Sequence, residues 1–490
     1  RLWRSISFHH NTDIYLGFFY PLLLRVFLSV YLPSLLDSGT LIPGLKYTDV
    51  DYYVYTDASN LIGDGGNPYD RHTYRYTPFL AHVILLINSP WNALWRCFDG
   101  ENDGQIFGWP YVNEGGRALF VLSDVFCGWL IISLRSHLHP RPKKDGCDNK
   151  IDTAGLFWWA YNPVAIVICT RGSCEPFLVL LPVLLAVHFS IVAAGRRRPP
   201  SMWTSAAAAG AALGLATHTK LYPVIYVPAF VARLSYLEGM TTGRLCWTAH
   251  NEALPKFPWD RPRTLLRYAL LWFRRVFGVT SARIFLLFFL VFFCGTSAVA
   301  SKLYGSEALD HALLYHLGRL DHRHCYSAFW YWIYLSGARK AHVSMSRAAT
   351  ALSSLPQIMV ILVSSVGIAP YDLPAALTVQ TLFFVAANRV ATAQYLTWWM
   401  ALMPLCNGRQ GVSLVAVVVV IVALLVWSAA AYWLEMRGAG NFLILWGATI
   451  MYWTGNVFFL VDFMSKYGKV GAGHARQQKI DQSSKKEHDD

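Results

Sequence analysis

Charged residues are scarce in this chain of 490 residues. Only 14% of the residues are Asp, Glu, Lys or Arg, whereas 54% are hydrophobic. A soluble globular domain usually carries about 25% charged residues, and a deficit of this size cannot be hidden in one core. The composition therefore excludes a soluble enzyme. Since each helical bilayer crossing needs about 20 apolar residues, the sequence predicts an all-α polytopic membrane protein.

Metal-binding and glycosylation patterns are also absent. The nine cysteines include no CxxC pair and no metal-ligand spacing, which argues against a zinc site. No Asn-x-Ser/Thr glycosylation site occurs in the chain. We find no internal repeat either. A secondary transporter would usually show paired halves with broken helices, so this absence makes a transporter the least favoured reading.

Apolar runs recur along most of the chain, and they predict about 10–13 transmembrane helices. The candidate spans are Tyr15–Leu36, Ala118–Leu134, Thr153–Thr170, Phe177–Ala194, Ser201–Thr217, Leu221–Leu234, Ile284–Ala300, Leu352–Ala369, Leu373–Ala387, Val390–Leu405, Val412–Trp433 and Phe442–Phe463. One further apolar run, Phe79–Ile87, is too short to cross and predicts an interfacial or re-entrant helix.

The basic residues fix an expected orientation. The formal net charge is +13, and Lys and Arg concentrate in alternate connections, which places those connections in the cytoplasm. Their dispersal between apolar runs argues against nucleic-acid binding. We expect one multi-span catalytic domain over residues 1–465, with a first luminal loop at 37–117 and a basic cytoplasmic loop at 235–283. Residues 466–490 are expected to form a polar, disordered cytoplasmic tail.

The first luminal loop contains two carboxylates at i and i+2, Asp49 and Asp51. Neighbouring carboxylates raise one another's pKa, which suits a general base or a shared cation. A DxD pair also occurs by chance in an Asp-rich loop. Downstream, Arg71, Tyr74 and Arg75 alternate where the chain re-enters the interface. Tyr prefers headgroup depth and Arg binds phosphate, although an ordinary aromatic belt would give the same pattern.

Further polar groups lie at span ends that the expected topology places on the same side. Ionisable groups near hydrocarbon are costly and are often functional, although each one alone could be a snorkelling interface residue. Cations gathered beside a carboxylate pair suggest handling of a phosphorylated lipid. The candidates are Arg171, His218, Lys220, His316, Arg319, Arg323, His324 and Gln394.

In these residues the chain resembles the family of GPI mannosyltransferase I, the PIG-M type catalytic subunit, which is a glycosyltransferase of the C superfamily. The resemblance covers roughly residues 15 to 460 and rests on matches in order and spacing. They are Tyr47 to Tyr52, Pro68 to Arg71, Thr73 to Pro78, Asn162-Pro163, Arg171-Gly172, His218, Lys220 to Pro223, Tyr315 to Leu317, Arg319, Asp321, Arg323-His324, Ser327, Gln394-Tyr395, Trp398 and Pro404-Leu405.

The resemblance implies the reaction. Dolichyl-phosphate-mannose would donate mannose to the 4-hydroxyl of glucosamine on GlcN-phosphatidylinositol or its inositol-acylated form, with inversion, at the luminal face of the endoplasmic reticulum. The family's DxD corresponds to Asp49 and Asp51. We take Asp49 as the general base and Asp51 as its orienting or acceptor-binding partner, and the two roles could be exchanged. The family also pairs with a small single-span stabilising subunit of PIG-X type.

No cofactor is expected, because C-superfamily enzymes that use dolichyl-phosphate sugars are generally metal-independent. Several positions depart from the family pattern, among them Ser173, which stands where the family usually has Asn. Glu175 stands where the family usually has Asp, and Cys325 stands where it usually has Asn. Cys174 and Cys325 are both expected in the lumen, which permits a disulfide, but the sequence does not set their separation. The nearest rival function is another dolichyl-phosphate-sugar transferase of the same superfamily with a different acceptor.

Overall fold

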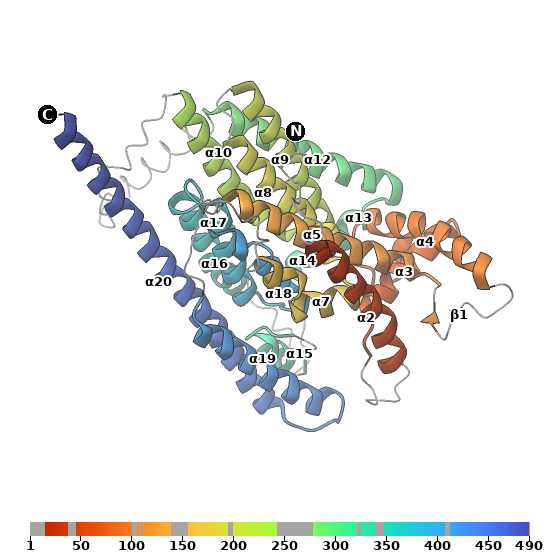
Figure 1. Ribbon diagram of the computed structural model, residues 1–490. Coiled ribbons are helices and arrows are strands. Elements are labelled where there is room, and N and C mark those ends of the chain that lie inside the picture. Colours follow the sequence, from red (N-terminus) through yellow and green to blue (C-terminus); the bar gives the residue numbers. More distant parts are fainter. Residues whose placement is uncertain are drawn as a thin grey trace. The chain divides into compact units, whose positions relative to one another are not determined.

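The computed structural model describes residues 15–37, 46–99, 105–106, 109–110, 112–138, 155–194, 199–242, 278–320, 325–338, 347–406 and 412–489. These residues are helical apart from turns and one antiparallel pair of two-residue strands, β1 (Gln105–Ile106) and β2 (Trp109–Pro110) (Figure 1). The predicted all-α architecture is therefore confirmed. Arg323 and His324, two of the candidate site residues, lie outside the described residues.

The structure divides into two compact units. From the sequence, we expect one domain over residues 1–465. The first unit comprises Arg1–Arg319, Ile361–Leu377 and Thr397–Leu405. Its α-helices are α2 (Tyr20–Leu36), α3 (Val50–Gly63), α4 (Pro78–Asp99), α5 (Gly115–Leu138), α7 (Pro163–Thr170), α8 (Leu181–Ala194), α9 (Pro199–Thr219), α10 (Val227–Thr242), α12 (Thr280–Tyr304), α13 (Glu307–Leu309) and α14 (Tyr315–Gly318).

Short 3-10 and π-helical segments connect or extend the helices of the first unit. They are η1 (Tyr15–Phe19), η2 (Pro68–Asp70), η3 (Leu156–Ala160), η4 (Pro176–Leu180), η5 (Tyr222–Tyr226), η6 (Asp310–Leu314) and η8 (Met403–Leu405). Three helices have residues in both units, namely α16 (Arg347–Gly367), α17 (Leu373–Ala386) and α18 (Leu396–Met400).

The second unit comprises Leu320–Val360, Thr378–Leu396 and Cys406–Asp490. It contains α15 (Trp330–Ala338), η7 (Ala393–Tyr395), α19 (Leu414–Glu435) and α20 (Phe442–Asp489). Trp330 and Trp427 both donate an indole N–H to Thr449 Oγ1, each at 3.0 Å, in a buried apolar core. Helix α20 continues through the residues for which the sequence predicts a disordered tail.

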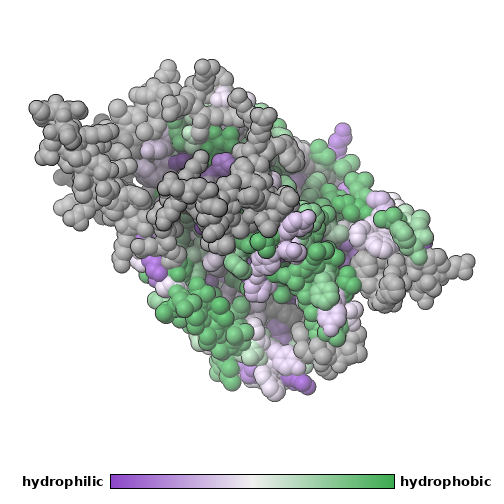
Figure 2. All heavy atoms as spheres, viewed as in Figure 1, coloured by the Kyte–Doolittle hydropathy of each residue, from purple (hydrophilic) through white to green (hydrophobic). Residues whose placement is uncertain are grey.

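Six described helices are long and apolar enough to cross a membrane, which fits a multi-pass membrane protein. They are Tyr15–Leu36, Gly115–Leu138, Pro176–Ala194, Thr280–Tyr304, Leu414–Glu435 and Phe442–Tyr467, and two shorter apolar helices are Ser354–Gly367 and Leu373–Ala386. Large hydrophobic side chains are exposed along them, as at Leu414, Val415 and Leu425 of α19. Figure 2 shows broad hydrophobic areas on the face that it displays.

The expected 10–13 spans exceed these six because several predicted runs are interrupted. Proline and asparagine at Asn162-Pro163 separate η3 from α7, where the sequence predicts one continuous span. The run Val390–Leu405 is a prediction that the structure contradicts, because it forms only η7, α18 and η8. The run Phe79–Ile87 lies in the 22-residue helix α4, which is not among the six.

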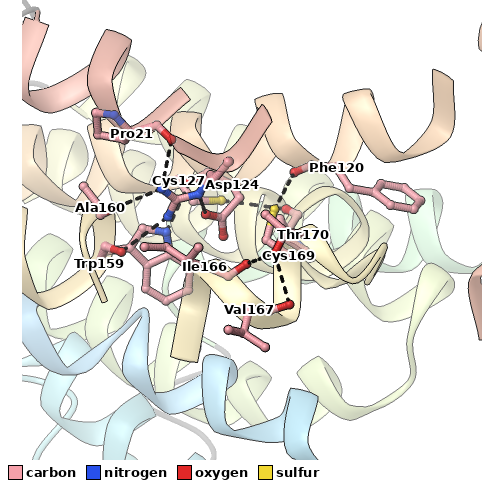
Figure 3. Close-up of polar contacts among 12 residues, drawn as sticks. Pro21, Phe120, Asp124, Cys127, Trp159, Ala160, Ile166, Val167, Cys169 and Thr170 are labelled. Carbon is pink, nitrogen blue, oxygen red and sulfur yellow. Dashed lines mark hydrogen bonds and ion pairs between the residues drawn. The ribbon is translucent and has the colours of Figure 1, made fainter. Parts of the chain in front are cut away.

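A buried ion pair joins the first span to the rest of its unit. Arg25 of α2 is fully buried, and its Nε donates to Asp124 Oδ2 of α5 at 2.7 Å (Figure 3). Its Nη1 donates to the carbonyl of Ala160 at 2.8 Å, and Nη2 donates to that of Trp159 at 3.5 Å. The indole of Trp159 in turn donates to the carbonyl of Asp124 at 3.2 Å. This network therefore fixes α2 and η3 against α5.

Arg117, in the first turn of α5, holds two segments that carry candidate site residues. Its guanidinium donates to the carbonyl of Thr170, at the end of α7, at 3.0 Å. It also donates to Thr48 Oγ1 at 3.2 Å, pairs with Glu114 at 2.6 Å and lies 4.8 Å from the ring centroid of Tyr52. Because Arg117 is buried, these contacts tie the start of α3 to the end of α7.

Gly172 makes the close approach between these two segments possible. Its φ is +92°, in the left-handed region that favours glycine. A Cβ at this position would lie 2.7 Å from Tyr52 Cδ2 and 2.8 Å from Tyr52 Cγ. The turn after α7 therefore rests directly on the ring of Tyr52 in α3.

We predict that Asp124→Ala destabilises the protein by about 3–5 kcal/mol, because it leaves Arg25 buried without its counter-ion. The measurement is the thermal unfolding midpoint of the detergent-solubilised protein. The matched control is Asp57→Ala, which removes an ion pair with Arg71 that is exposed to solvent and contributes little. Equal midpoints for the two variants would contradict the structural role of the buried pair.

Gly172→Ala is expected to cost about 1–3 kcal/mol, from backbone strain and from collision with Tyr52. The control is Gly65→Ala, because Gly65 also has a positive φ, +81°, but has open space where a Cβ would lie. The larger loss of unfolding free energy should be at Gly172. If the two substitutions cost the same in denaturant titrations, contact with Tyr52 is not what requires glycine there.

Candidate active site

Asp49 and Asp51 lie at the N-terminus of α3. Asp49 is the N-cap residue, and its Oδ1 accepts the backbone N–H of Asp51 at 3.1 Å. The backbone N–H of Asp49 donates to the carbonyl of Arg171 at 2.9 Å, and Arg171 Nε donates to the carbonyl of Tyr47 at 2.8 Å. These two bonds join the DxD segment to the turn after α7. Both carboxylates are only partly buried.

The surroundings of Asp49 raise its pKa above the ordinary range of an aspartate. Burial is the main cause, and the negative charge of Asp51 adds to it. The positive charges of Arg171 and Lys220 act in the opposite direction, as does the hydrogen bond from Asp51 N–H. The arrangement therefore brings the basicity of this carboxylate closer to that needed at neutral pH.

A chain of hydroxyl and thiol groups orients Asp51. Tyr76 Oη donates to Asp51 Oδ2 at 2.9 Å, and Tyr55 Oη donates to Tyr76 Oη at 3.1 Å. Behind them, Cys174 Sγ donates to Tyr55 Oη at 3.3 Å. Burial, and then the charge of Asp51, raises the pKa of Tyr76 well above its usual value, so its hydroxyl stays protonated. Cys174 and Cys325 are both reduced cysteines in the structure.

Lys220 places a positive charge near enough to Asp49 to act on its pKa. Its ammonium forms an ion pair with Glu175, which is fully buried at the start of η4. Trp398 of α18 donates its indole N–H to Glu175 Oε2 at 2.8 Å, and its ring lies 5.2 Å from Lys220 Nζ. Tyr222 stacks on Trp398 with ring centroids 3.6 Å apart. The two rings and the carboxylate together fix the position of the ammonium.

A second group of basic residues surrounds Arg75, which precedes Tyr76 in the chain. Arg75 Nη1 is 2.7 Å from His311 Nδ1, and its guanidinium is 4.6 Å from the ring centroid of Tyr315. His316 Nε2 is 3.0 Å from the carbonyl oxygen of Arg75. Burial lowers the pKa of His316 to about 4, and the charges of Lys220, Arg319 and Arg75 contribute. His316 is therefore neutral at pH 7 and donates to this carbonyl.

The structure thus brings most of the predicted site residues together. Asp49, Asp51, Arg171, Lys220, Arg75, His316 and Arg319 interact directly or through charge within the first unit. Their roles in substrate binding or catalysis stay predictions.

The other described candidates make different contacts. Arg71 pairs at the surface with Asp57, and the buried Tyr74 donates its hydroxyl to the carbonyl of Thr77. His218 is buried, with Nδ1 3.0 Å from Ser297 Oγ, so it belongs to the packing of α9 against α12. Gln394 belongs to η7 of the second unit.

Sequence reasoning did not single out Tyr76, Glu175, Tyr222 or Trp398 as site residues. Three of them had a local signal that could have been used, because they lie one to four residues from Arg75, Arg171 or Lys220. Trp398 was among the matches to the family, but its contacts depend on the tertiary packing of α18 beside η4 and η5. Among the described residues, no three His, Cys, Asp or Glu side chains gather at metal-binding distances. The expectation that no metal is needed stays a prediction.

Comparison with known proteins places this geometry in a family. Residues 168–464 match the family model described as Mannosyltransferase (PIG-M). The chain is 31% identical over 435 residues to GPI mannosyltransferase 1 of Gibberella zeae, which covers 85% of this chain and 86% of that protein. It is 32% identical over 417 residues to GPI mannosyltransferase 1 of Emericella nidulans, covering 81% and 83% of the two chains.

An animal relative is similar over the same extent. The GPI alpha-1,4-mannosyltransferase I catalytic subunit of Danio rerio is 31% identical over 430 residues, covering 86% of this chain and 90% of that protein. The family match includes Arg171, Glu175, Lys220 and Trp398, and the relatives extend the similarity over most of the chain. The chain therefore belongs to the PIG-M mannosyltransferase family and is a glycosyltransferase.

Proposed function

We propose that this enzyme adds the first α1,4-linked mannose of the GPI anchor. The donor is dolichyl-phosphate-mannose, the acceptor is GlcN-phosphatidylinositol or its inositol-acylated form, and the active site faces the lumen of the endoplasmic reticulum. The names of the relatives support the pathway. The observation that supports the chemistry is the placement of Asp49 and Asp51 beside the positive charges of Arg171 and Lys220.

The reaction is an inverting displacement. The 4-hydroxyl of the acceptor glucosamine loses its proton to a carboxylate, and its oxygen attacks the anomeric carbon of mannose. The bond from that carbon to the phosphate oxygen breaks, and the electron pair leaves with dolichyl phosphate. This step needs a base beside the hydroxyl and positive charge beside the departing phosphate.

Asp49 is suited to the role of general base. It is only partly buried, and the one hydrogen bond to its side chain that the described residues supply engages Oδ1, which leaves Oδ2 for the acceptor hydroxyl. Its raised pKa favours proton uptake. Asp51 fits an orienting role, because Tyr76 already donates to its Oδ2. Its charge also contributes to the basicity of Asp49.

Lys220 and Arg171 are suited to bind the phosphate of the donor. Lys220 is held by Glu175 and Trp398, so it gains a fixed direction without losing its charge. Arg171 uses Nε to hold Tyr47, and among the described residues its two Nη groups make no other hydrogen bond. A guanidinium can present two parallel N–H donors to phosphate. The two cations would together stabilise the charge that develops on the leaving group.

We further propose that a small single-span subunit of PIG-X type stabilises the enzyme. The Danio rerio relative is named as a catalytic subunit, which supports a second chain. Assays of activity are therefore designed with that subunit present and absent.

Transfer of labelled mannose in microsomes tests the reaction. Microsomes from cells without their own first GPI mannosyltransferase receive this chain, labelled dolichyl-phosphate-mannose and GlcN-phosphatidylinositol. Wild-type protein should form a singly mannosylated GPI lipid, and Asp49→Asn should reduce the rate about 10²–10⁴-fold through loss of the base. Asp51→Asn should keep measurable activity.

The matched control is Asp57→Asn, in the same helix but on the surface beside Arg71, which should act like wild type. Product from both site variants at the wild-type rate would overturn the carboxylate mechanism. A larger loss for Asp51→Asn than for Asp49→Asn would exchange the two roles. No product from well-expressed wild type, with either subunit composition, would refute the proposed reaction.

The pH dependence of kcat/KM should report the base. The rate should fall as the pH drops through the raised pKa of Asp49, because the base must be deprotonated. Asp51→Asn removes the negative charge that helps to raise this pKa, so the acid limb of its profile should move to lower pH. Asp57→Asn should leave the limb in place. An acid limb that stays unchanged or moves upward in Asp51→Asn would contradict the coupling of the two carboxylates.

A further inference from the structure

Arg75 belongs to a cationic group that the chemistry at Asp49 does not use. We call Arg75, His311, Tyr315 and His316 the Arg75 cluster. The ring of Tyr315 lies beneath the guanidinium at 4.6 Å, and His316 is within hydrogen-bond distance of the carbonyl of Arg75. His311 also stacks on Tyr69, with ring centroids 5.4 Å apart. The cluster is therefore built from both the first luminal loop and the segment after α12.

Unlike Arg25 and Arg117, the two buried arginines of this unit, Arg75 has no carboxylate partner among the described residues. Arg25 pairs with Asp124 and Arg117 pairs with Glu114. Arg75 instead donates to His311 Nδ1 at 2.7 Å, an arrangement in which the imidazole is neutral and carries its proton on Nε2. The remaining guanidinium N–H groups and His311 Nε2–H are then donors that the described residues do not satisfy.

Both donor groups are accessible to a ligand. Arg75 and His311 are each partly exposed. A half-buried arginine beside a second N–H donor, with aromatic rings beneath both and no protein carboxylate, is a site for an oxyanion such as phosphate. His316 adds no competing charge, because its imidazole donates to the backbone of Arg75 and holds that segment in place.

The position of the cluster indicates which phosphate it binds. Tyr76, the next residue in the chain, donates to Asp51, whereas the side chain of Arg75 reaches η6 and α14. The donor phosphate is joined to the reacting carbon through one oxygen, so it must lie at the carboxylates, where Lys220 and Arg171 are. The acceptor phosphodiester is separated from its reacting hydroxyl by two rings, glucosamine and inositol. It must therefore lie away from the carboxylates.

We propose that the Arg75 cluster binds the phosphodiester of the inositol phospholipid acceptor, while Lys220 and Arg171 bind the phosphate of the donor. This inference rests on the proposed function. It divides the basic residues into two subsites, one for each lipid phosphate.

Steady-state kinetics with paired acceptors tests this division, using the full chain in the same microsomes. One acceptor is GlcN-phosphatidylinositol, and the other is a glucosaminyl-inositol that carries its alkyl chain through an ether without phosphate. Wild type should have a lower KM for the phosphodiester. Arg75→Gln should raise that KM about tenfold or more, which corresponds to loss of a charge-assisted contact. It should leave the KM values of the ether acceptor and of dolichyl-phosphate-mannose unchanged.

Three companion variants separate this effect from misfolding and from the donor subsite. Arg75→Lys keeps the charge but loses the planar fork, so its KM for the phosphodiester should be intermediate. Lys220→Gln should instead raise the KM of the donor. Arg437→Gln is the matched control, because Arg437 also lies over a tyrosine, 5.7 Å from the ring centroid of Tyr432. Its kinetics should match those of wild type at equal protein level.

Several outcomes would overturn the proposal. The proposal fails if wild type does not distinguish the two acceptors, if Arg75→Gln still prefers the phosphodiester as strongly as wild type does, or if the donor KM of Arg75→Gln rises instead. In each case wild type makes product, so the proposed function stands while this inference fails. If wild type makes no product with either acceptor, the proposed function fails, and the inference fails with it.

Discussion

The candidate site depends on one close contact, between the turn after α7 and the start of α3. Asp49 and Arg171 are 122 positions apart in the sequence, yet the backbone N–H of Asp49 donates to the carbonyl of Arg171. Gly172 allows this approach because no side chain stands between it and Tyr52. Arg117 stabilises this contact by hydrogen bonding to Thr170 in one segment and to Thr48 in the other. Without this contact, the carboxylates of Asp49 and Asp51 would be separated from Arg171.

The basic residues around this contact differ in how completely carboxylates neutralise them. The arginines that act as structural supports, Arg25 and Arg117, are buried and each pairs with a carboxylate, Asp124 and Glu114 respectively. Lys220 has a carboxylate partner but also aromatic rings, so its charge is positioned. Arg75 has no carboxylate partner among the described residues. This gradation separates groups that stabilise the fold from groups that remain available to anionic lipids.

The sequence predicted the members of the site better than it predicted their partners. Asp49, Asp51, Arg171 and Lys220 were recognisable because polar residues at span ends are rare and costly. His218 lies only two residues before Lys220, but the two side chains have different surroundings. His218 is within α9 and contacts Ser297 of α12, whereas Lys220 follows the end of α9 at Thr219 and pairs with Glu175. The sequence alone does not show which of the two side chains faces the site.

The fold could be predicted in class but not in detail, for related reasons. Long apolar runs such as those of α5 and α19 are recognisable as helices from hydropathy alone. Hydropathy does not show the breaks at Asn162-Pro163 and at Pro223, where the structure has shorter segments. The stacking of Tyr222 on Trp398 joins segments separated by 176 positions, and no local sequence pattern predicts this contact.

That same stacking determines when the enzyme becomes complete during its synthesis. Asp49, Glu175 and Lys220 are all made in the first half of the chain, but the indole that holds Glu175 is supplied by Trp398. A nascent chain that has inserted its early helices therefore carries the carboxylates and the lysine without the partner that fixes them. The hydrogen bond that fixes Glu175 can form only after translation has reached Trp398.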